Sequence, residues 1–391
     1  MALVNIHDML NHAYRNRYAI GAFDLINLDF LEAILQAAER LESPVILSLA
    51  ESHFAYFDFE LIMPAVEAAA KRTKIPVAIH LDHGESLQTA IDSIRYGCNS
   101  IMVDASNSAL DENIAMTKRV VDMAHACGIA VEGELGYVPG VEGEDAERHP
   151  GEIAYTELND ALRYVRETGV DSLAVSIGTV HGRLRGEPKL DIKRLASLNE
   201  ALAIPLVIHG GTGLSDDQFS QLIANGVAKI NYFTALADAA LLNCKSNSTS
   251  ASSYTSLFTG TKEAIANEVE RCITLWGSAD RANQLLQSCQ PWNTVEHVIV
   301  FNVKNIDEKA TTDMIETGRS ALLGIPGVRE VVTGGAVKND SSYQYCWLIR
   351  FCHPGVIESY KHHPVHVDFA DSLFRPVAAD RISIDYQLHN K

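Results

Sequence analysis

Three histidines of the chain share a local setting that could hold a metal ion. His83, His181 and His209 each follow a short apolar run typical of a β-strand, and each is followed by glycine. Imidazole is a common metal ligand, and three protein ligands with one open position are the usual pattern of catalytic zinc. The glycines let the backbone approach a bound group closely. Together the three residues predict a metal site, whereas any one alone would indicate a hydrogen-bonded structural histidine.

Acidic residues accompany these histidines at the predicted strand ends. Asp82 precedes His83, and a carboxylate beside a metal can transfer a proton to a reacting oxygen. The alternative role for Asp82 is to orient a histidine. Asp104 and Glu134 could bind a second cation or orient the ligands. Glu132 and Glu134 are two residues apart, so both are expected on one face of a strand.

Two segments are suited to bind phosphate. The run Gly210-Gly211-Thr212-Gly213 follows a predicted strand and precedes a helix predicted at Ser215–Ala224. Glycines and a helix N-terminus offer unpaired N–H donors and a favourable dipole. The second segment is Lys229–Thr234, which also lies at a strand end. Barrels of parallel strands often bind phosphate between their last two strand-to-helix loops.

The elements that must position these residues follow a regular alternation of strand and helix. Amphipathic stretches such as Leu28–Leu41 and Leu87–Tyr96 separate apolar runs that lack polar alternation, as expected of parallel strands buried on both faces. The runs are Tyr18–Phe23, Pro44–Leu49, Pro76–Leu81, Ser100–Val103, Ile129–Val131, Ser172–Ile177, Pro205–Ile208 and Ala228–Ile230. Eight such units in roughly 280 residues predict an α/β fold, a (β/α)8 TIM barrel, with the polar residues at its active-site end. A doubly wound sheet is the alternative.

Composition narrows the classes of partner. The 391 residues are 47% hydrophobic and carry a formal charge of −18, which argues against nucleic acid and anionic membranes as partners. The sequence contains no run of 18 apolar residues, the length that would predict a membrane span. The first residues lack the features of a signal peptide. The seven cysteines include no CxxC pair. Reduced thiols and a cytoplasmic location are therefore expected.

The end of the chain has a different pattern. A Ser-, Asn- and Thr-rich stretch at Asn243–Ser256 is interpreted as a mobile loop, and a break follows around Pro291. Beyond it, strand and helix patterns of an α+β domain alternate. We therefore expect two domains, residues 1–287 and residues 293–391. The predicted tail elements are His297–Val303, Asp307–Leu322, Gly327–Val332, Tyr343–Phe351, Pro364–Phe374 and Arg381–Tyr386.

The first part of the chain, about residues 3–285, resembles the class II, metal-dependent ketose-bisphosphate aldolases, which include the fructose-bisphosphate aldolases. The matching segments are His80–Gly84, Met102–Ser106, Glu132–Gly136, Ser172–Gly182 with Gly186–Leu190, and Ile208–Leu214. The resemblance implies one catalytic Zn²⁺ held by His83, His181 and His209. It implies that Asp82 is the acid that protonates the aldehyde oxygen during cleavage or condensation. Glu142 matches a mobile-loop acid that exchanges a proton at the enediolate carbon.

The same resemblance extends to the rest of the site. Asp104 and Glu134 match positions near an alternative metal site, which makes a second cation site possible. The resemblance also implies which residues bind the phosphate of dihydroxyacetone phosphate. They are Gly182, Gly210, Gly211, Thr212, Asn231 and Thr234. Three features depart from the family pattern, namely Asp24 in place of Asn, Ser48-Leu49-Ala50 in place of Gln-x-Ser, and Phe233 in place of Asp. The part of the site that holds the ketone product therefore keeps the family pattern, whereas the departures affect the part that holds the aldehyde product.

These expectations define an aldolase that reversibly cleaves a phosphorylated ketose, such as fructose 1,6-bisphosphate, to dihydroxyacetone phosphate and an aldehyde. Zinc would stabilise the enediolate charge as a Lewis acid. A Schiff-base lysine is the other route to this reaction, and we expect no such lysine because none is evident among the inward positions. The alternatives are an aldolase for tagatose bisphosphate or a deoxy-keto-gluconate phosphate, and a non-catalytic sugar-phosphate sensor. A sensor needs no proton donor such as Asp82.

Residues 293–391 resemble the stress-responsive dimeric α/β-barrel (Dabb) domains. The matching pieces are His297–Phe301, Ile325–Val328, Tyr360–His366 and Asp385-Tyr386. The resemblance implies a ferredoxin-like fold that pairs through its sheet, and hence a homo-oligomer, either a dimer or a tetramer. Some relatives perform cyclase chemistry with Tyr and His residues, for which Tyr360, His363 and His366 are candidates here. Helix packing and dimerisation are the favoured interpretation of these three residues.

Overall fold

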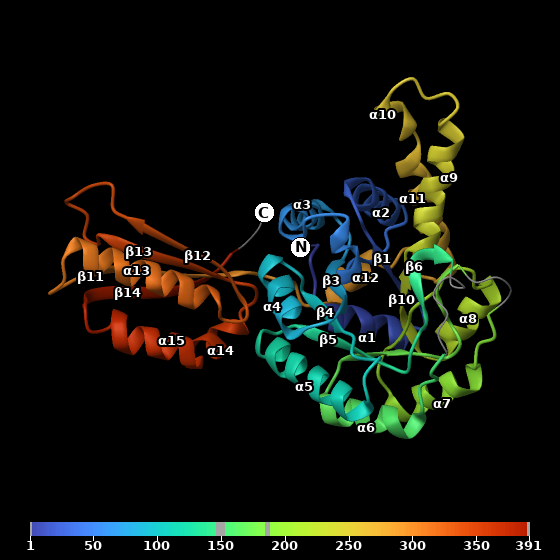
Figure 1. The fold of residues 1–391 in the computed structure, drawn as a ribbon, viewed down its shortest axis with the longest axis horizontal. Helices are drawn as coiled ribbons and strands as arrows, with labels where there is room; N and C mark the ends of the chain where they lie inside the picture. The colour runs from blue at the N-terminus through green and yellow to red at the C-terminus, as the bar shows by residue number, and fades with distance from the viewer. Residues whose placement is uncertain (1, 146–152, 184–187, 389–391) are drawn as a thin grey trace. The chain divides into compact units, whose positions relative to one another are not determined.

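The computed structural model describes residues 2–145, 153–183 and 188–388 of the chain. The chain forms two compact units (Figure 1). The larger comprises residues 1–90, 98–121 and 130–291, and the smaller is built mainly on residues 292–391. None of the helices in the described ranges is long and apolar enough to cross a membrane.

The larger unit contains a closed barrel of eight parallel strands. Each strand contains residues of one of the eight predicted apolar runs. The barrel strands are β1 (Ile20–Asp24), β2 (Val45–Ala50), β3 (Val77–Gly84), β4 (Ser100–Val103), β5 (Ala130–Leu135), β7 (Ser172–Val175), β9 (Leu206–Ile208) and β10 (Val227–Tyr232). Closure between β1 and β10 confirms the TIM barrel and rules out the doubly wound sheet.

Burial explains why these runs form strands. Most barrel-strand side chains are buried, because the interior of the barrel takes one set and the helices cover the other. The register of the pairs brings the strand ends level: Ala50 of β2 lies opposite Asp82 of β3, and Ala22 of β1 lies opposite Asn231 of β10. Polar residues at the carboxyl ends of the strands therefore meet at one mouth.

Helices surround the barrel (Figure 1). Several begin at side chains that cap the first turn, such as Asn27 before α2 and the Ser215–Gln218 capping box at α8. The helices are α1 (Ile6–Asn16), α2 (Leu28–Arg40), α3 (Phe59–Arg72), α4 (Leu87–Tyr96), α5 (Leu110–Ala126), α6 (Leu158–Thr168), α7 (Ile192–Leu202), α8 (Asp216–Ala224) and α12 (Ala282–Ser288). The short helix η1 (Glu51–Ala55) follows β2, and a two-stranded ribbon pairs β6 (Gly140–Asp145) with β8 (His181–Arg183).

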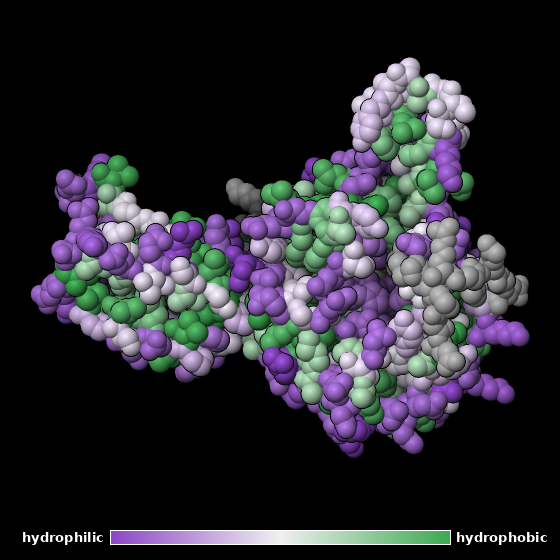
Figure 2. Space-filling view, viewed as in Figure 1, coloured by the Kyte–Doolittle hydropathy of each residue, from purple (hydrophilic) through white to green (hydrophobic). Residues whose placement is uncertain are grey.

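A helical hairpin replaces most of the loop predicted at Asn243–Ser256. Helix α9 (Thr234–Asn247) includes the first five residues of that stretch, and α10 (Tyr254–Leu257) includes its end. Helix α11 (Thr261–Leu275) packs along α9, and the Asn243 and Asn247 amides donate hydrogen bonds to carbonyls of residues 257–259. The prediction of a loop was thus wrong for the first and last residues of Asn243–Ser256. These residues are helical because tertiary hydrogen bonds satisfy the asparagine side chains. Figure 2 shows pale, weakly polar residues around the tip.

The smaller unit has the predicted ferredoxin-like order of strands and helices. Its antiparallel sheet has the strand order β12-β13-β11-β14. The elements are β11 (Val295–Val303), α13 (Glu308–Leu323), β12 (Val328–Gly335), β13 (Tyr345–Phe351), α14 (Val356–His362), α15 (Pro364–Phe369), the π-helical turn η3 (Ala370–Phe374) and β14 (Ala378–Gln387). Helix α14 had no counterpart in the predicted elements.

Candidate metal and catalytic site

The end of β3 places two neighbouring side chains at the barrel mouth. Adjacent residues of a strand normally point to opposite faces. His83 has a left-handed backbone with φ of +47°, a rare conformation for a residue other than glycine. This turn brings its Nε2 within 4.0 Å of Oδ2 of Asp82. Such local strain is often found at functional sites.

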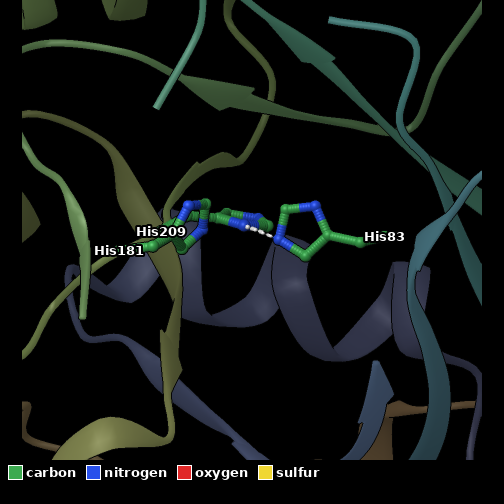
Figure 3. Close-up of side chains that lie close together, drawn as sticks. All are labelled: His83, His181 and His209. Carbon is green, nitrogen blue, oxygen red and sulfur yellow. Dashed lines mark hydrogen bonds between the residues drawn. The ribbon is translucent and has the colours of Figure 1, made fainter. Parts of the chain in front are cut away.

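The three histidines converge although they come from β3, β8 and the loop after β9 (Figure 3). Their candidate ligand atoms all lie within 4.8 Å of one another. The ring centres of His83 and His209 are 4.7 Å apart, and Nε2 of His83 lies 2.9 Å from Nδ1 of His209. His181 and His209 are themselves buried and His83 is partly buried. The structure therefore brings together all three predicted metal ligands.

Each histidine also uses its second ring nitrogen toward an oxygen. Nδ1 of His83 lies 2.8 Å from Oδ2 of Asp104, Nδ1 of His181 lies 3.1 Å from the carbonyl oxygen of Val138, and Nε2 of His209 lies 3.0 Å from Oε1 of Glu132. These oxygens accept the ring N–H, which leaves the lone pairs on the nitrogens that face the cluster. Metal-ligating histidines usually show this arrangement, so the donor set fits a metal ion.

Asp82 is buried beside the cluster and held by an amide. Nδ2 of Asn231 donates a 2.8 Å hydrogen bond to Oδ1 of Asp82. Burial raises the pKa of Asp82, but the electrostatic influence of His83, His209 and Lys229 and the hydrogen bond from Asn231 outweigh it, and the net pKa is lowered. The carboxylate is therefore ionised at rest. In cleavage it can take the proton of a substrate hydroxyl, and in condensation it can return that proton as an acid.

A second group of possible ligands shares one imidazole with the first. His83, Asp104 and Glu134 offer ligand atoms within 4.8 Å of one another. Burial and the neighbouring acid Asp104 raise the pKa of Glu134 well above its usual value, whereas the His83 hydrogen bond lowers the pKa of Asp104 despite its burial. The two pKa values thus shift in opposite directions, as expected of two neighbouring acids that repel each other when both are ionised.

The barrel interior holds Lys229, which the sequence placed only in a predicted phosphate-binding segment. Lys229 is fully buried, with its Nζ 2.8 Å from Oε2 of Glu132 and 3.3 Å from Nε2 of His80. The expectation of no inward lysine was therefore wrong. The period of two could have found it, because Lys229 is two residues before the inward Asn231 on β10. Its ion pair with Glu132 makes it a charged structural group rather than a free amine nucleophile.

Replacing Lys229 by Met should destabilise the barrel, because Glu132 would remain buried without its counter-charge. Loss of one partner of a buried ion pair costs about 3–5 kcal/mol. The matched control is Lys262→Met, since Lys262 forms an exposed 2.7 Å ion pair with Glu32, and such pairs contribute about 0–1 kcal/mol. Urea unfolding of the metal-free wild type and of each variant measures the two losses in the free energy of unfolding. Equal, small effects of the two variants would contradict this role of Lys229.

The predicted phosphate-binding residues gather around the start of α9 and the loop after β9. Gly210 has φ of +69°, and a Cβ there would lie 2.1 Å from the carbonyl oxygen of Val180, so glycine is required. Oγ1 of Thr212 accepts a 3.3 Å hydrogen bond from the Ala235 N–H in the first turn of α9. Helix N-termini favour anions, and this arrangement is compatible with a phosphate cradle.

The remaining members of the predicted cradle lie close to this helix start. Oγ1 of Thr234 accepts a 3.0 Å hydrogen bond from the N–H of Gly143 on β6. Gly182 lies on β8 with φ of +82°, and Gly211 lies against β10. Asn231 differs, because its amide nitrogen binds Asp82, and in the described ranges its buried Oδ1 has no hydrogen-bond partner. Asn231 is thus placed to accept a hydrogen bond from substrate.

The ribbon that carries Glu142 is tied to α9 by an arginine. Nε of Arg183 on β8 donates a 2.8 Å hydrogen bond to Oδ2 of Asp238, and its NH1 donates to the carbonyl oxygen of Gly143 at 2.9 Å. The backbone of Glu142 belongs to β6, but its side chain lies outside the described part of the structure. Sequence reasoning gave no indication of the Arg183–Asp238 pair, which joins positions 55 residues apart.

The positions that depart from the family pattern lie at the mouth of the first strands. Asp24 ends β1 and Ala50 ends β2, and both are buried. Phe233 is also buried, with its ring 4.5 Å from the ring of His53 and 6.0 Å from that of Phe30. Aromatic groups therefore occupy the position where the family pattern carries an acid.

The fold and the cluster together define a TIM-barrel protein with a candidate metal site at the carboxyl ends of its strands. Residues 4–281 match the family described as fructose-bisphosphate aldolase class-II, and residues 295–388 match the stress responsive A/B barrel domain. The chain belongs to the class II fructose-bisphosphate aldolase family and ends in a Dabb domain, as the sequence resemblance implied.

Relatives and solved structures agree with this membership. The chain is 41% identical to the probable fructose-bisphosphate aldolase of Bacillus subtilis over 237 residues, 60% of this chain and 82% of the relative. The fructose-bisphosphate aldolase of Geobacillus stearothermophilus is 41% identical over 238 residues, with the same coverage. The YdjI aldolase from Escherichia coli K12 is a structural neighbour with a TM-score of 0.65 and 35% identity, covering 72% of this chain and 99% of its own. A putative fructose-1,6-biphosphate aldolase from Coccidioides immitis has the same TM-score, 30% identity, and covers 71% and 97%.

Proposed function

We propose that this aldolase uses one zinc ion, held by His83, His181 and His209, to cleave a phosphorylated ketose reversibly. The observation that carries the proposal is the common orientation of the three imidazoles, each with its outer N–H on an oxygen and its lone pair toward the cluster. Bound zinc would stabilise the negative charge that develops on the ketone oxygen. His83, Asp104 and Glu134 are proposed as a second cation site.

The chain's own residues supply the proton transfers and the orientation of the substrate. Asp82 takes the proton of the hydroxyl group next to the breaking bond, and Asn231 holds that carboxylate in place. Glu142 on β6 is proposed to exchange the proton at the enediolate carbon. Backbone N–H groups around Gly182, Gly210 and Gly211 bind the phosphate, together with Thr212 and Thr234. The enediolate is thus protected between the cluster and the ribbon.

The substrate follows from which half of the site matches the family. The residues proposed to bind the phosphate keep the family pattern, which supports dihydroxyacetone phosphate as one product. Fructose 1,6-bisphosphate is the first candidate, since several relatives are named for it. Tagatose bisphosphate and a deoxy-keto-gluconate phosphate are the alternatives, because Asp24, Ala50 and Phe233 alter the aldehyde half.

A screen of phosphorylated ketoses for release of dihydroxyacetone phosphate tests this proposal. The zinc-loaded full chain should cleave at least one ketose 1-phosphate, and the preferred one identifies the aldehyde. Binding of these sugars without turnover of any of them would instead support the non-catalytic sensor. The presence of Asp82 beside the histidine cluster favours the enzyme, because a sensor needs no proton donor.

The tail is proposed to join chains into a dimer or tetramer through the uncovered face of its sheet. One face of the sheet points toward the helices, whereas the other carries apolar side chains that are more than a third exposed. These side chains are Val332, Leu348, Ile382, Ile384 and Tyr386. Exposed apolar patches of this kind mark association surfaces, and a second copy offers the same patch. The domain limits 1–287 and 293–391 and a cytoplasmic location stay predictions.

Replacing Ile384 by Glu should reduce the size of the oligomer, because a buried unpaired charge opposes association. The matched control is Val337→Glu, since Val337 is fully exposed in the turn after β12 and its replacement alters no sheet face. Light scattering of the two full-length variants measures the difference. An Ile384→Glu protein of wild-type mass would contradict dimerisation through this face.

A further inference from the structure

Arg183 contacts two neighbouring elements of the barrel unit at once. It ends β8, two residues after the proposed zinc ligand His181. Its Nε donates a 2.8 Å hydrogen bond to Oδ2 of Asp238 on α9, and its Nη2 donates to the other oxygen of that carboxylate. Its Nη1 donates to the carbonyl oxygen of Gly143 on β6 over 2.9 Å. One planar guanidinium therefore binds a helix with one edge and a strand with another.

Gly143 is the point at which β6 is fixed to α9, which lies beside it (Figure 1). Its carbonyl oxygen accepts from Arg183, and its N–H donates a 3.0 Å hydrogen bond to Oγ1 of Thr234. Thr234 and Asp238 are four residues apart on α9, so both lie on one face of the helix. Gly143 has φ of +79°, and a Cβ there would lie 3.3 Å from the ring of Phe233. A glycine thus lets the strand lie close to the start of the helix.

The strand pairing within the ribbon gives this part of β6 little support. Strand β6 pairs with β8 at its two ends, Gly140 and Asp145, and the ladder is irregular between them. Glu142 lies in this irregular stretch and directly precedes Gly143. Backbone hydrogen bonds between strands normally fix the position of a strand. The bonds from Arg183 and Thr234 to Gly143 therefore serve this purpose for the middle of β6.

The Arg183–Asp238 pair is poorly suited to serve stability alone. The two side chains are 34% and 29% exposed, and ion pairs that water reaches stabilise a fold little. Helix α9 also packs along α11, so it does not depend on this pair. The guanidinium is directed at the strand that carries Glu142 and at the helix that begins at the proposed phosphate site, which indicates a role in geometry. A displacement of about 1 Å can slow a catalysed reaction about 10²-fold.

We propose that Arg183 and Asp238 are positioning residues that fix the ribbon at Gly143, so that Glu142 is held in place for proton exchange at the enediolate carbon. The inference rests on the proposed function of Glu142, and both residues act through it rather than on the substrate. The fork of an arginine is needed, because a single ammonium group cannot bind the Asp238 carboxylate and the Gly143 carbonyl with the same geometry.

Proton exchange of dihydroxyacetone phosphate in D₂O tests the proposal without any aldehyde. The hydroxymethyl carbon loses a proton to form the enediolate and regains a deuteron from the solvent, which proton NMR follows on the zinc-loaded full chain. Asp238→Asn should slow this exchange at least about tenfold, because one partner of the guanidinium loses its charge. Zinc content should be unchanged and the Kd of dihydroxyacetone phosphate should stay within about threefold, since the Gly210 turn and the Thr212–Ala235 hydrogen bond do not involve the pair.

The matched control is Asp191→Asn, which should leave the exchange rate unchanged. Asp191 also forms an ion pair with an arginine, Arg194, at 3.2 Å and comparable exposure, but at the start of α7. Asparagine is as good a helix cap as aspartate, so the control keeps its helix. Arg183→Lys should slow exchange as Asp238→Asn does, although it keeps the charge.

A combined variant shows whether the pair acts through Glu142. In a Glu142→Gln protein, the further change Asp238→Asn should cause no additional loss of exchange, because residues that act through one another are not additive. A full additional loss would mean that the pair acts on the substrate directly and would overturn the proposal.

Amide hydrogen exchange of residues 140–145 measures the ribbon itself. These amides should exchange faster in Asp238→Asn than in the wild type, whereas those of α11 should not change. A released ribbon with a wild-type rate of proton exchange would reduce the pair to a structural contact and overturn the inference alone, as would a wild-type rate with an unchanged ribbon. No proton exchange by the wild type would instead overturn the proposed function, and this inference with it.

Discussion

Removal of metal with a chelator is expected to abolish carbon–carbon bond cleavage, and zinc is expected to restore it. The three imidazoles present their lone pairs to one another. The buried Lys229 is paired with Glu132 and is not available to the substrate. The enediolate charge therefore depends on the bound metal for its stabilisation. The measurement is a coupled assay for dihydroxyacetone phosphate before and after chelation, with metal content determined in parallel. Full activity of a protein shown to contain no metal would contradict this mechanism.

Variants of single histidines show whether the loss of activity comes from the loss of zinc or from a general loss of structure. His209→Ala should lose most of its zinc, because two strong ligands remain and Glu132 loses the ring N–H that it accepts. The matched control is His362→Ala, since His362 is an exposed histidine of the tail and should leave both zinc content and cleavage unchanged. Normal zinc content in His209→Ala would exclude His209 as a ligand.

The barrel and the histidine cluster could be predicted because both depend on local, periodic signals. Apolar runs such as Ser100–Val103 predict strands almost residue for residue, since buried parallel strands carry a continuous apolar pattern. His83, His181 and His209 could be grouped because all three follow such runs, and a closed barrel brings strand ends together. The family resemblance then assigned their roles.

The parts that could not be predicted depend on contacts between distant residues. The strand period could have placed Lys229 inside the barrel, but only the closed barrel shows that it contacts Glu132 and His80. The Arg183–Asp238 pair depends on how the β6–β8 ribbon packs on α9. Asn231 was assigned to the phosphate, whereas its amide nitrogen is bonded to Asp82. In each case the partner is set by tertiary packing, which no short spacing along the chain records.

Replacing Asp82 by Asn should lower kcat by about 10²–10⁴, the usual contribution of a positioned acid or base. The substitution keeps the shape, and the oxygen of the new amide can still accept the hydrogen bond that Nδ2 of Asn231 donates over 2.8 Å. The carboxylate, however, is ionised at rest because its electrostatic surroundings and the Asn231 hydrogen bond lower its pKa despite burial. Asn cannot take the hydroxyl proton, so the chemical step should fail although substrate and zinc still bind.

Separate measurements of kcat and of binding distinguish a proton-transfer role of Asp82 from a role in orienting the histidines. If Asp82 moves the proton, zinc content and substrate Kd of Asp82→Asn stay near wild type while kcat falls. Asp217→Asn, at an exposed position of α8, is the matched control and should change neither quantity. If Asp82 mainly orients His83, whose Nε2 lies 4.0 Å away, zinc affinity should fall together with kcat, and added zinc should recover activity. A kcat within a few-fold of wild type would mean that another group carries the proton, and Glu142 on the neighbouring ribbon would then be the first residue to replace.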